Sequence, residues 1–139
     1  MNFLEIVLIY VGTFVAVSVI DYVWHLVLLR KPFEAGIAKV GVVVDGQIKI
    51  QDGLAGLISQ VLVIGAIMFL VLYGRPEPTL LDGALIGGAG GILAISVYGL
   101  VNRALIKGWN KTITALEVAW GPMLGASAGV IIVVLSRLF

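Results

Sequence analysis

The chain has 139 residues, of which 60% are hydrophobic and 12% are charged; its net charge is +1 and its mean hydropathy is +1.13. This composition is typical of a membrane protein, and the small net charge gives no reason to expect a nucleic-acid partner. Because the chain contains no cysteine, it cannot form a disulfide, a thiolate metal site or a cysteine nucleophile. One histidine without cysteine does not favour a haem or zinc site either, so we expect no cofactor and no metal.

Four segments are long and apolar enough to cross a bilayer, which takes about 20 mostly apolar residues. They lie at about 3–29, 54–73, 82–103 and 113–136. The predicted fold is therefore all-α: a polytopic membrane protein formed by a four-transmembrane-helix bundle, with a longer amphipathic first cytoplasmic loop. Residues 1–139 form a single integral membrane domain in this interpretation.

Basic residues predict the orientation of the bundle. The first and third connections are rich in them, whereas the opposite side carries two. By the positive-inside rule, these connections face the cytoplasm and both termini are extracytoplasmic, in the inner (plasma) membrane of a cell. The basic residues are Arg30, Lys31, Lys39 and Lys49 in the first connection, Arg103, Lys107 and Lys111 in the third, and Arg75 and Arg137 on the opposite side.

The first connection has features of its own. Pro32 is expected to end the first helix, and residues 33–40 could form a short interfacial helix. Residues 42–50 contain the Asp-Gly pair that is typical of a tight β-hairpin. Because an isolated hairpin is only marginally stable, an amphipathic loop on the lipid head groups is the alternative.

The second connection is short and contains Pro76 and Pro78. Proline blocks helix continuation, so the second and third helices should form an antiparallel hairpin.

Glycines recur at every fourth position in the third and fourth helices, where small residues allow two helix backbones to approach closely. Each set forms a stripe that we expect to face protein. The two stripes could pack against each other within one chain or could mediate dimerisation. The helix-packing glycines are Gly83, Gly87 and Gly91 in the third helix, and Gly121, Gly125 and Gly129 in the fourth.

Two carboxylates are expected to lie inside the membrane. At 1.5 Å per residue, Asp21 lies about 12 Å from the cytoplasmic end of the first helix, and Glu117 lies a little over one turn into the fourth. A charge at such a depth is costly unless it is paired, so each acid needs a partner within the bundle. Each acid also has a tryptophan three residues later on the same helical face, so the four side chains could line one pocket.

The candidate polar site combines these pairs with groups from the end of the third helix, where Arg103 or Lys107 would supply the countercharge. It consists of Asp21, Trp24, Tyr98, Asn102, Arg103, Glu117 and Trp120. The alternative is that these polar groups only satisfy one another and fix the register of the bundle, with the tryptophans as interfacial anchors. His25, next to Trp24, is interpreted as an interfacial residue rather than a ligand.

The chain also resembles a known family at these positions. Tyr98-Gly-Leu-Val-Asn102, Leu105-Ile-Lys-Gly-Trp109 and Glu117-Val-Ala-Trp-Gly121 are similar to the carboxy-terminal signature of the bacterial membrane family called domain of unknown function 2177. Asp21-Tyr-Val-Trp24 resembles its amino-terminal signature. The resemblance implies a four-helix inner-membrane protein without an assigned activity. Gly99 and Val101 stand where that family usually has aspartate and threonine, and Glu117 replaces a shorter acid.

Three classes of function fit this sequence. The first is a lipid-binding or accessory protein of the bacterial inner membrane, whose partners would be a membrane lipid and a second copy or another membrane protein. The alternative is a small proton-coupled transporter that uses Asp21 and Glu117 as titrating groups. A lipid-modifying enzyme is third, because no nucleophile–base pair, metal cluster or phosphate-binding loop supports it.

Overall fold

The computed structural model describes residues 1–40, 43–44, 47–48, 53–73, 75 and 77–139. Four helical segments in it are long and apolar enough to span a membrane: Phe3–Leu28, Gly53–Leu72, Leu80–Leu105 and Lys111–Ser136. Every end of these segments lies within two residues of the predicted boundary. The predicted four-helix membrane bundle is therefore confirmed.

Two of the four spans are not continuous α-helices. The first consists of α1 and a π-helical segment, and the third of α4, a second π-helical segment and α5. The elements in chain order are α1 (Phe3–Tyr22), the π-helical segment Val23–Leu28, α2 (Arg30–Ile37), the 3-10 turn Ala38–Val40, β1 (Val43–Val44), β2 (Gln47–Ile48), α3 (Gly53–Leu72), α4 (Leu80–Gly91), the π-helical segment Ile92–Ser96, α5 (Val97–Leu105) and α6 (Lys111–Ser136).

The helices begin where the sequence supplies caps. Asn2 with Glu5, and Thr79 with Asp82, form capping boxes that satisfy free N–H groups at the starts of α1 and α4. Asn110 caps α6 by accepting a hydrogen bond from the backbone of Thr112. The starts of three spanning helices are thus encoded locally.

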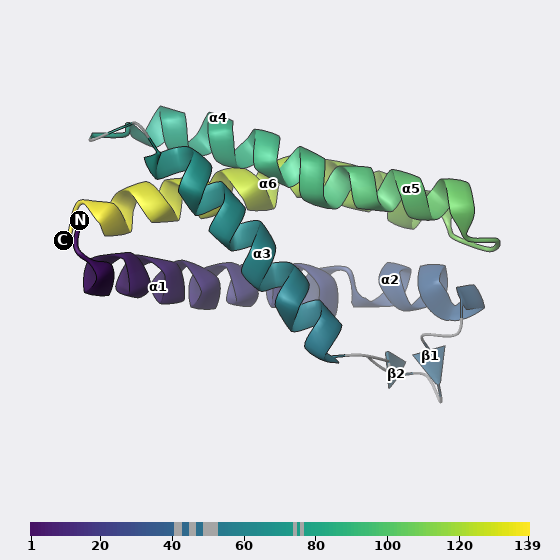
Figure 1. Ribbon diagram of the computed structural model, residues 1–139. Coiled ribbons are helices and arrows are strands. Elements are labelled where there is room, and N and C mark those ends of the chain that lie inside the picture. The colour runs from purple at the N-terminus through teal and green to yellow at the C-terminus, as the bar shows by residue number, and fades with distance from the viewer. Residues whose placement is uncertain (41–42, 45–46, 49–52, 74, 76) are drawn as a thin grey trace.

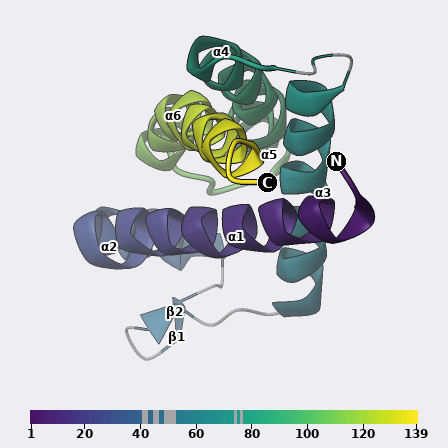
Figure 2. The ribbon, with the colours of Figure 1, turned by 90° about the vertical axis from the view of Figure 1, so that its left-hand side faces the viewer.

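Figure 1 shows α1, the α4–α5 rod and α6 running alongside one another, with α3 crossing them diagonally. Both termini lie at the same end of the bundle, whereas α2, the strand pair and the α5–α6 turn lie at the opposite end. Viewed from the end that carries the termini, α4 and α6 are stacked on one side of α1, and α3 flanks them (Figure 2).

The contact between α4 and α6 is the most extensive in the bundle. Gly83, Gly87 and Gly91 of α4 face Gly129, Gly125 and Gly121 of α6, respectively. A Cβ atom added at any of these six positions would overlap backbone atoms of the facing glycine. The two stripes meet each other within one chain, so the backbones approach at a distance that no larger side chain allows.

The first connection begins with α2, which packs against the bundle. The helix that starts the chain ends at Leu28, four residues earlier than Pro32, and Pro32 instead lies in the first turn of α2. The expectation that Pro32 ends the first helix was therefore wrong; proline is tolerated in a first turn because the N–H groups there have no helical partner. α2 packs on α6, where a Cβ atom at Gly36 would overlap the side chain of Ile113.

The strands β1 and β2 pair in antiparallel fashion, with Val43 opposite Ile48 and Val44 opposite Gln47. This pairing is that of the hairpin considered for the first connection. Its Asp-Gly turn lies outside the described residues.

The second connection joins α3 to α4, and these two helices are in contact as neighbours. Pro78 precedes the Thr79 cap, and its carbonyl oxygen accepts a hydrogen bond from Arg137 at 3.3 Å. Pro76 lies outside the described residues. This contact ties the carboxy-terminal end of α6 to the start of α4.

Candidate functional site

One of the two acid–tryptophan pairs is linked across the helices, because the tryptophan of α6 bonds to the acid of α1. The indole Nε1 of Trp120, on α6, donates a hydrogen bond to Asp21 Oδ1, on α1, at 2.8 Å. The ring of Trp24 stacks on that of Trp120, with 4.2 Å between centroids and an angle of 2° between planes. Each indole thus contacts the other helix, and the pair joins α1 to α6.

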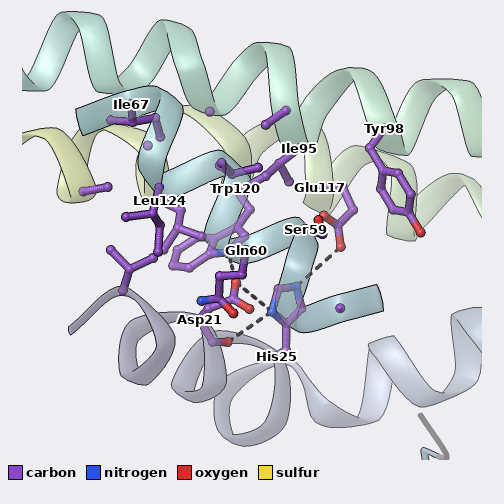
Figure 3. Close-up of a pocket in the computed structure, with 18 residues that line it drawn as sticks. Asp21, His25, Ser59, Gln60, Ile67, Ile95, Tyr98, Glu117, Trp120 and Leu124 are labelled. Atoms are coloured by element: carbon purple, nitrogen blue, oxygen red, sulfur yellow. Dashed lines mark hydrogen bonds and ion pairs between the residues drawn. The ribbon is translucent and has the colours of Figure 1, made fainter. Parts of the chain in front are cut away.

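His25 bridges the two acids (Figure 3). Its Nδ1 lies 3.1 Å from Asp21 Oδ1, and its Nε2 lies 3.4 Å from Glu117 Oε1. Asp21, His25 and Glu117 are called the polar cluster below. A neutral imidazole donates from one nitrogen only, so both contacts are favourable only when His25 is an imidazolium or when one of the carboxyl groups is protonated. Either arrangement gives the polar cluster a net charge of −1.

The backbone of the first span changes its winding at this site. His25 lies in the π-helical segment Val23–Leu28, where the backbone N–H of Leu29 donates to the carbonyl oxygen of Trp24 at 2.9 Å. A π-turn rotates the following side chains relative to a regular α-helix, and such turns are frequent at functional sites. The second π-helical segment, Ile92–Ser96, lies on the facing span and contributes Ala94 and Ile95 to the same pocket.

A hydrogen bond from Ser96 supports the part of α6 that carries Glu117. Pro122 lies inside α6 and has no N–H, so the carbonyl oxygen of Val118 lacks its helical donor. The hydroxyl of Ser96 donates to that oxygen at 3.0 Å, and Ser96 itself is buried. The bond fixes the second π-helical segment to α6 one residue away from Glu117.

The polar cluster lines a partly open pocket with a volume of about 290 Å³. In Figure 3, Ile67 and Leu124 lie at one side of the pocket, whereas His25, Glu117 and Tyr98 lie at the other. The pocket therefore joins a polar region to an apolar one. Its walls consist of Val17, Asp21, His25, Gly56, Ser59, Gln60, Val63, Ile64, Ile67, Gly91, Ala94, Ile95, Tyr98, Glu117, Trp120, Leu124, Gly125 and Ala128.

The structure brings four of the candidate residues into this pocket: Asp21, Tyr98, Glu117 and Trp120. Trp24 does not line the pocket but lies behind Trp120.

The other two candidates lie elsewhere. Arg103 donates to the carbonyl oxygen of Trp109 at 3.0 Å, and the acids have His25 rather than Arg103 as their ion-pair partner among the described residues. Asn102 is buried, and its Nδ2 has no hydrogen-bond partner in the described part of the chain. Lys107, the other countercharge considered, is exposed in the turn before α6.

The position of His25 differs from the one predicted from the sequence. It was interpreted as an interfacial residue, yet it lies between the two acids. The spacing of four residues between Asp21 and His25 was the available signal, because such residues share a helical face. Gln60 and Ser59, on α3, were also missed; Gln60 donates to Ser18 on α1 at 3.0 Å, a contact between helices that no local spacing indicates.

Gly99 allows α5 to approach α6 closely beside Glu117. A Cβ atom at Gly99 would lie 2.9 Å from Cβ of Glu117, which is closer than real Cβ atoms pack. The absence of a side chain at Gly99 therefore lets α5 pack directly against the base of the Glu117 side chain.

No group of three or more histidine or acidic side chains within the described ranges could hold a metal ion. The fold and the pocket together define a multi-pass membrane protein with a partly buried polar cluster inside a four-helix bundle. The family described as predicted membrane protein (DUF2177) matches residues 6–134, and the chain belongs to this family. The resemblance noted from the sequence motifs is thereby confirmed. No curated protein and no solved structure matches the chain.

Proposed function

We propose that this membrane protein binds a small amphipathic molecule, a lipid of its own membrane, in the pocket beside the polar cluster. The observation that carries the proposal is the combination of Asp21, His25 and Glu117 with an apolar wall in one partly open pocket. Ligand pockets are usually largely apolar, with a few placed polar groups, and measure about 300–1,000 Å³. The volume of about 290 Å³ suits a head group with the first part of a chain rather than a whole lipid.

The position of the pocket supports this occupant. It extends from Gly56, near the start of α3, to Ala128, in the second half of α6, so it runs from one end of the bundle toward its centre. Helix α3, which crosses the bundle diagonally (Figure 1), contributes residues from Gly56 to Ile67 to the wall of the pocket. A ligand head at the polar cluster would therefore place its chain among Val17, Ile64 and Leu124 at membrane depth.

The orientation belongs to the same proposal. The first and third connections face the cytoplasm of a bacterial cell, and both termini are extracytoplasmic in the inner membrane. The excess of basic residues in those two connections supports this orientation. In this orientation, the polar cluster lies within the membrane just beneath the head groups of the cytoplasmic leaflet, where a lipid head group can reach it.

Native mass spectrometry of the protein, gently extracted from its own membrane, tests the proposal. The wild type should carry a bound lipid or small amphiphile that is lost or reduced in Asp21→Asn and in Glu117→Gln. Glu34→Gln is the matched control, because Glu34 pairs with Arg30 on α2 at 2.8 Å and does not line the pocket. A wild type without any bound molecule, or an adduct that is equally abundant in all variants, contradicts the proposal.

A proton-coupled carrier is the second candidate. It is favoured by three titratable side chains that contact one another in a row across the bundle. Asp21, His25 and Glu117 form an unbroken series across two helices, as a proton relay requires. In proteoliposomes with an imposed pH gradient, the wild type should move protons or a coupled solute, and Asp21→Asn and Glu117→Gln should abolish the flux. Flux retained in both folded variants excludes this mechanism.

A further inference from the structure

We infer that the head group bound in this pocket is a primary amine, carried as an ammonium ion. The inference rests on the proposed function and specifies its ligand class. It starts from charge: the charged groups of the wall are Asp21, Glu117 and His25, and no lysine or arginine is among the described residues that line the pocket. The polar cluster has a net charge of −1 whether His25 is an imidazolium between two carboxylates or is neutral beside one protonated carboxyl group. The pocket is therefore anionic in both arrangements.

Glu117 has unused capacity to accept hydrogen bonds. It is 8% exposed, and its polar contact among the described residues is the one with His25 Nε2 at 3.4 Å. A carboxylate accepts about four hydrogen bonds. A buried carboxylate with a single long contact is costly, and a ligand that donates to it removes that cost.

An ammonium group matches the remaining polar atoms of the wall. It has three N–H donors and no acceptor, whereas the carboxylates only accept. Gln60 uses its amide nitrogen on Ser18, so its amide oxygen remains available as a further acceptor.

The aromatic side chains of the wall favour a cation as well. Trp120 uses its N–H group on Asp21, so it offers the pocket its ring rather than a donor. Tyr98, on α5, also lines the pocket. A cation over an aromatic face is attracted by the ring quadrupole, and this attraction increases where water is excluded.

Other head groups fit less well. A phosphate or carboxylate would place a second negative charge beside the polar cluster in a medium of low dielectric constant, where like charges repel strongly. An alcohol can donate one hydrogen bond but gains no charge attraction. The pocket therefore discriminates by charge at one end and accepts a hydrocarbon chain at the other, beside Val17, Ile67 and Leu124.

A competition between probes of one chain length tests the inference on the wild type. Purified protein in mild detergent is incubated with equal concentrations of hexadecylamine, hexadecanol and hexadecanoic acid, and the adducts are resolved by native mass spectrometry. The amine should bind about tenfold more tightly than the alcohol, as expected for one added charge contact in a partly buried site, and the acid should bind most weakly. Equal adducts of amine and alcohol, or a preference for the acid, overturn the inference.

Competition with butylamine, which lacks a long chain, distinguishes an amine-bearing lipid from a small soluble amine as the ligand. If the apolar wall takes a chain, butylamine should compete poorly with hexadecylamine. Competition at equal concentration would show that the pocket binds the amine alone, which retains the amine preference but contradicts a lipid ligand.

Variants attribute the preference to the pocket. Glu117→Gln keeps the shape of the side chain and removes its charge, so it should lower the preference for amine over alcohol about tenfold. Glu34→Gln should leave it unchanged. If no probe binds, the proposed function itself fails; if all three bind alike, amphiphile binding stands and the amine assignment fails.

Discussion

The stacked tryptophans offer a matched pair of substitutions. Trp120→Phe and Trp24→Phe each replace an indole by a phenyl ring within the same stack. Trp120 donates to Asp21 at 2.8 Å, whereas Nε1 of Trp24 is buried and has no hydrogen-bond partner among the described residues. We therefore expect Trp120→Phe to destabilise the bundle more than Trp24→Phe.

The size of the difference follows from the donor that is lost. Both substitutions remove the same atoms from the stack, so the loss of packing largely cancels in the comparison. Trp120→Phe also leaves Asp21 without its indole donor; hydrogen bonds to charged groups contribute about 1.5–3 kcal/mol in soluble proteins, and contacts between membrane helices rather less. Trp24→Phe removes an N–H that was unsatisfied. The expected difference in the free energy of unfolding is about 1–2 kcal/mol, a factor of about 5–30 in the unfolding equilibrium.

The measurement is reversible unfolding from mild detergent by titration with sodium dodecyl sulfate, followed by far-ultraviolet circular dichroism because the substitutions alter tryptophan fluorescence. Asp21→Asn combined with each substitution completes a double-mutant cycle, and Asp21 should couple to Trp120 but not to Trp24. Equal destabilisation by Trp120→Phe and Trp24→Phe, or stronger coupling of Asp21 to Trp24, would refute the assigned hydrogen bond.

Three further substitutions test the packing around the pocket. Ser96→Ala should lower the free energy of unfolding by about 1–2 kcal/mol, because the carbonyl oxygen of Val118 would lose its hydrogen-bond donor. In the same titration, Ser127→Ala, whose hydroxyl is exposed, should lower it by less than about 0.5 kcal/mol. Equal losses in the two variants would show that the hydrogen bond of Ser96 does not stabilise the bundle. Gly87→Leu should force α4 and α6 apart and destabilise the bundle by about 3 kcal/mol or more, whereas Gly56→Leu has no atom within 4 Å of its Cβ and should be nearly neutral; undiminished stability of Gly87→Leu would be incompatible with the close helix contact. Gly99→Ala should displace the buried glutamate and weaken hexadecylamine binding severalfold in native mass spectra, and an unchanged affinity would show that this glycine does not set the position of the acid.

The sequence alone determined the spans and the family. A bilayer requires a run of about 20 mostly apolar residues, and this is a local property that can be counted along the chain. Thr79 with Asp82 marks the start of α4 for the same reason, since a capping box is completed within four residues. The spacing of the glycines also indicated helix faces, because every fourth residue of a helix lies on one side.

The tertiary structure decided which side chains meet. Spacing within the first and fourth spans placed each acid beside a tryptophan, but it could not show that Trp120 donates to the acid of the other span. It could not reveal that His25, rather than Arg103, faces both carboxylates, because that choice depends on how α1 is rotated against α6. The π-helical turn that carries His25 contributes to this rotation, and its register follows from packing rather than from local preference.

Ser96 and Pro122 illustrate the same limit. Proline is visible in the sequence as a residue that frees a carbonyl oxygen, but the donor that satisfies this oxygen comes from another helix, 22 residues away along the chain. Local sequence therefore specified which segments cross the membrane and which groups need partners. The choice of partners, and with it the polar cluster, arises only when four helices with fixed faces pack together, because hydrogen bonds and ion pairs act over a few ångströms in space whatever their separation in the chain.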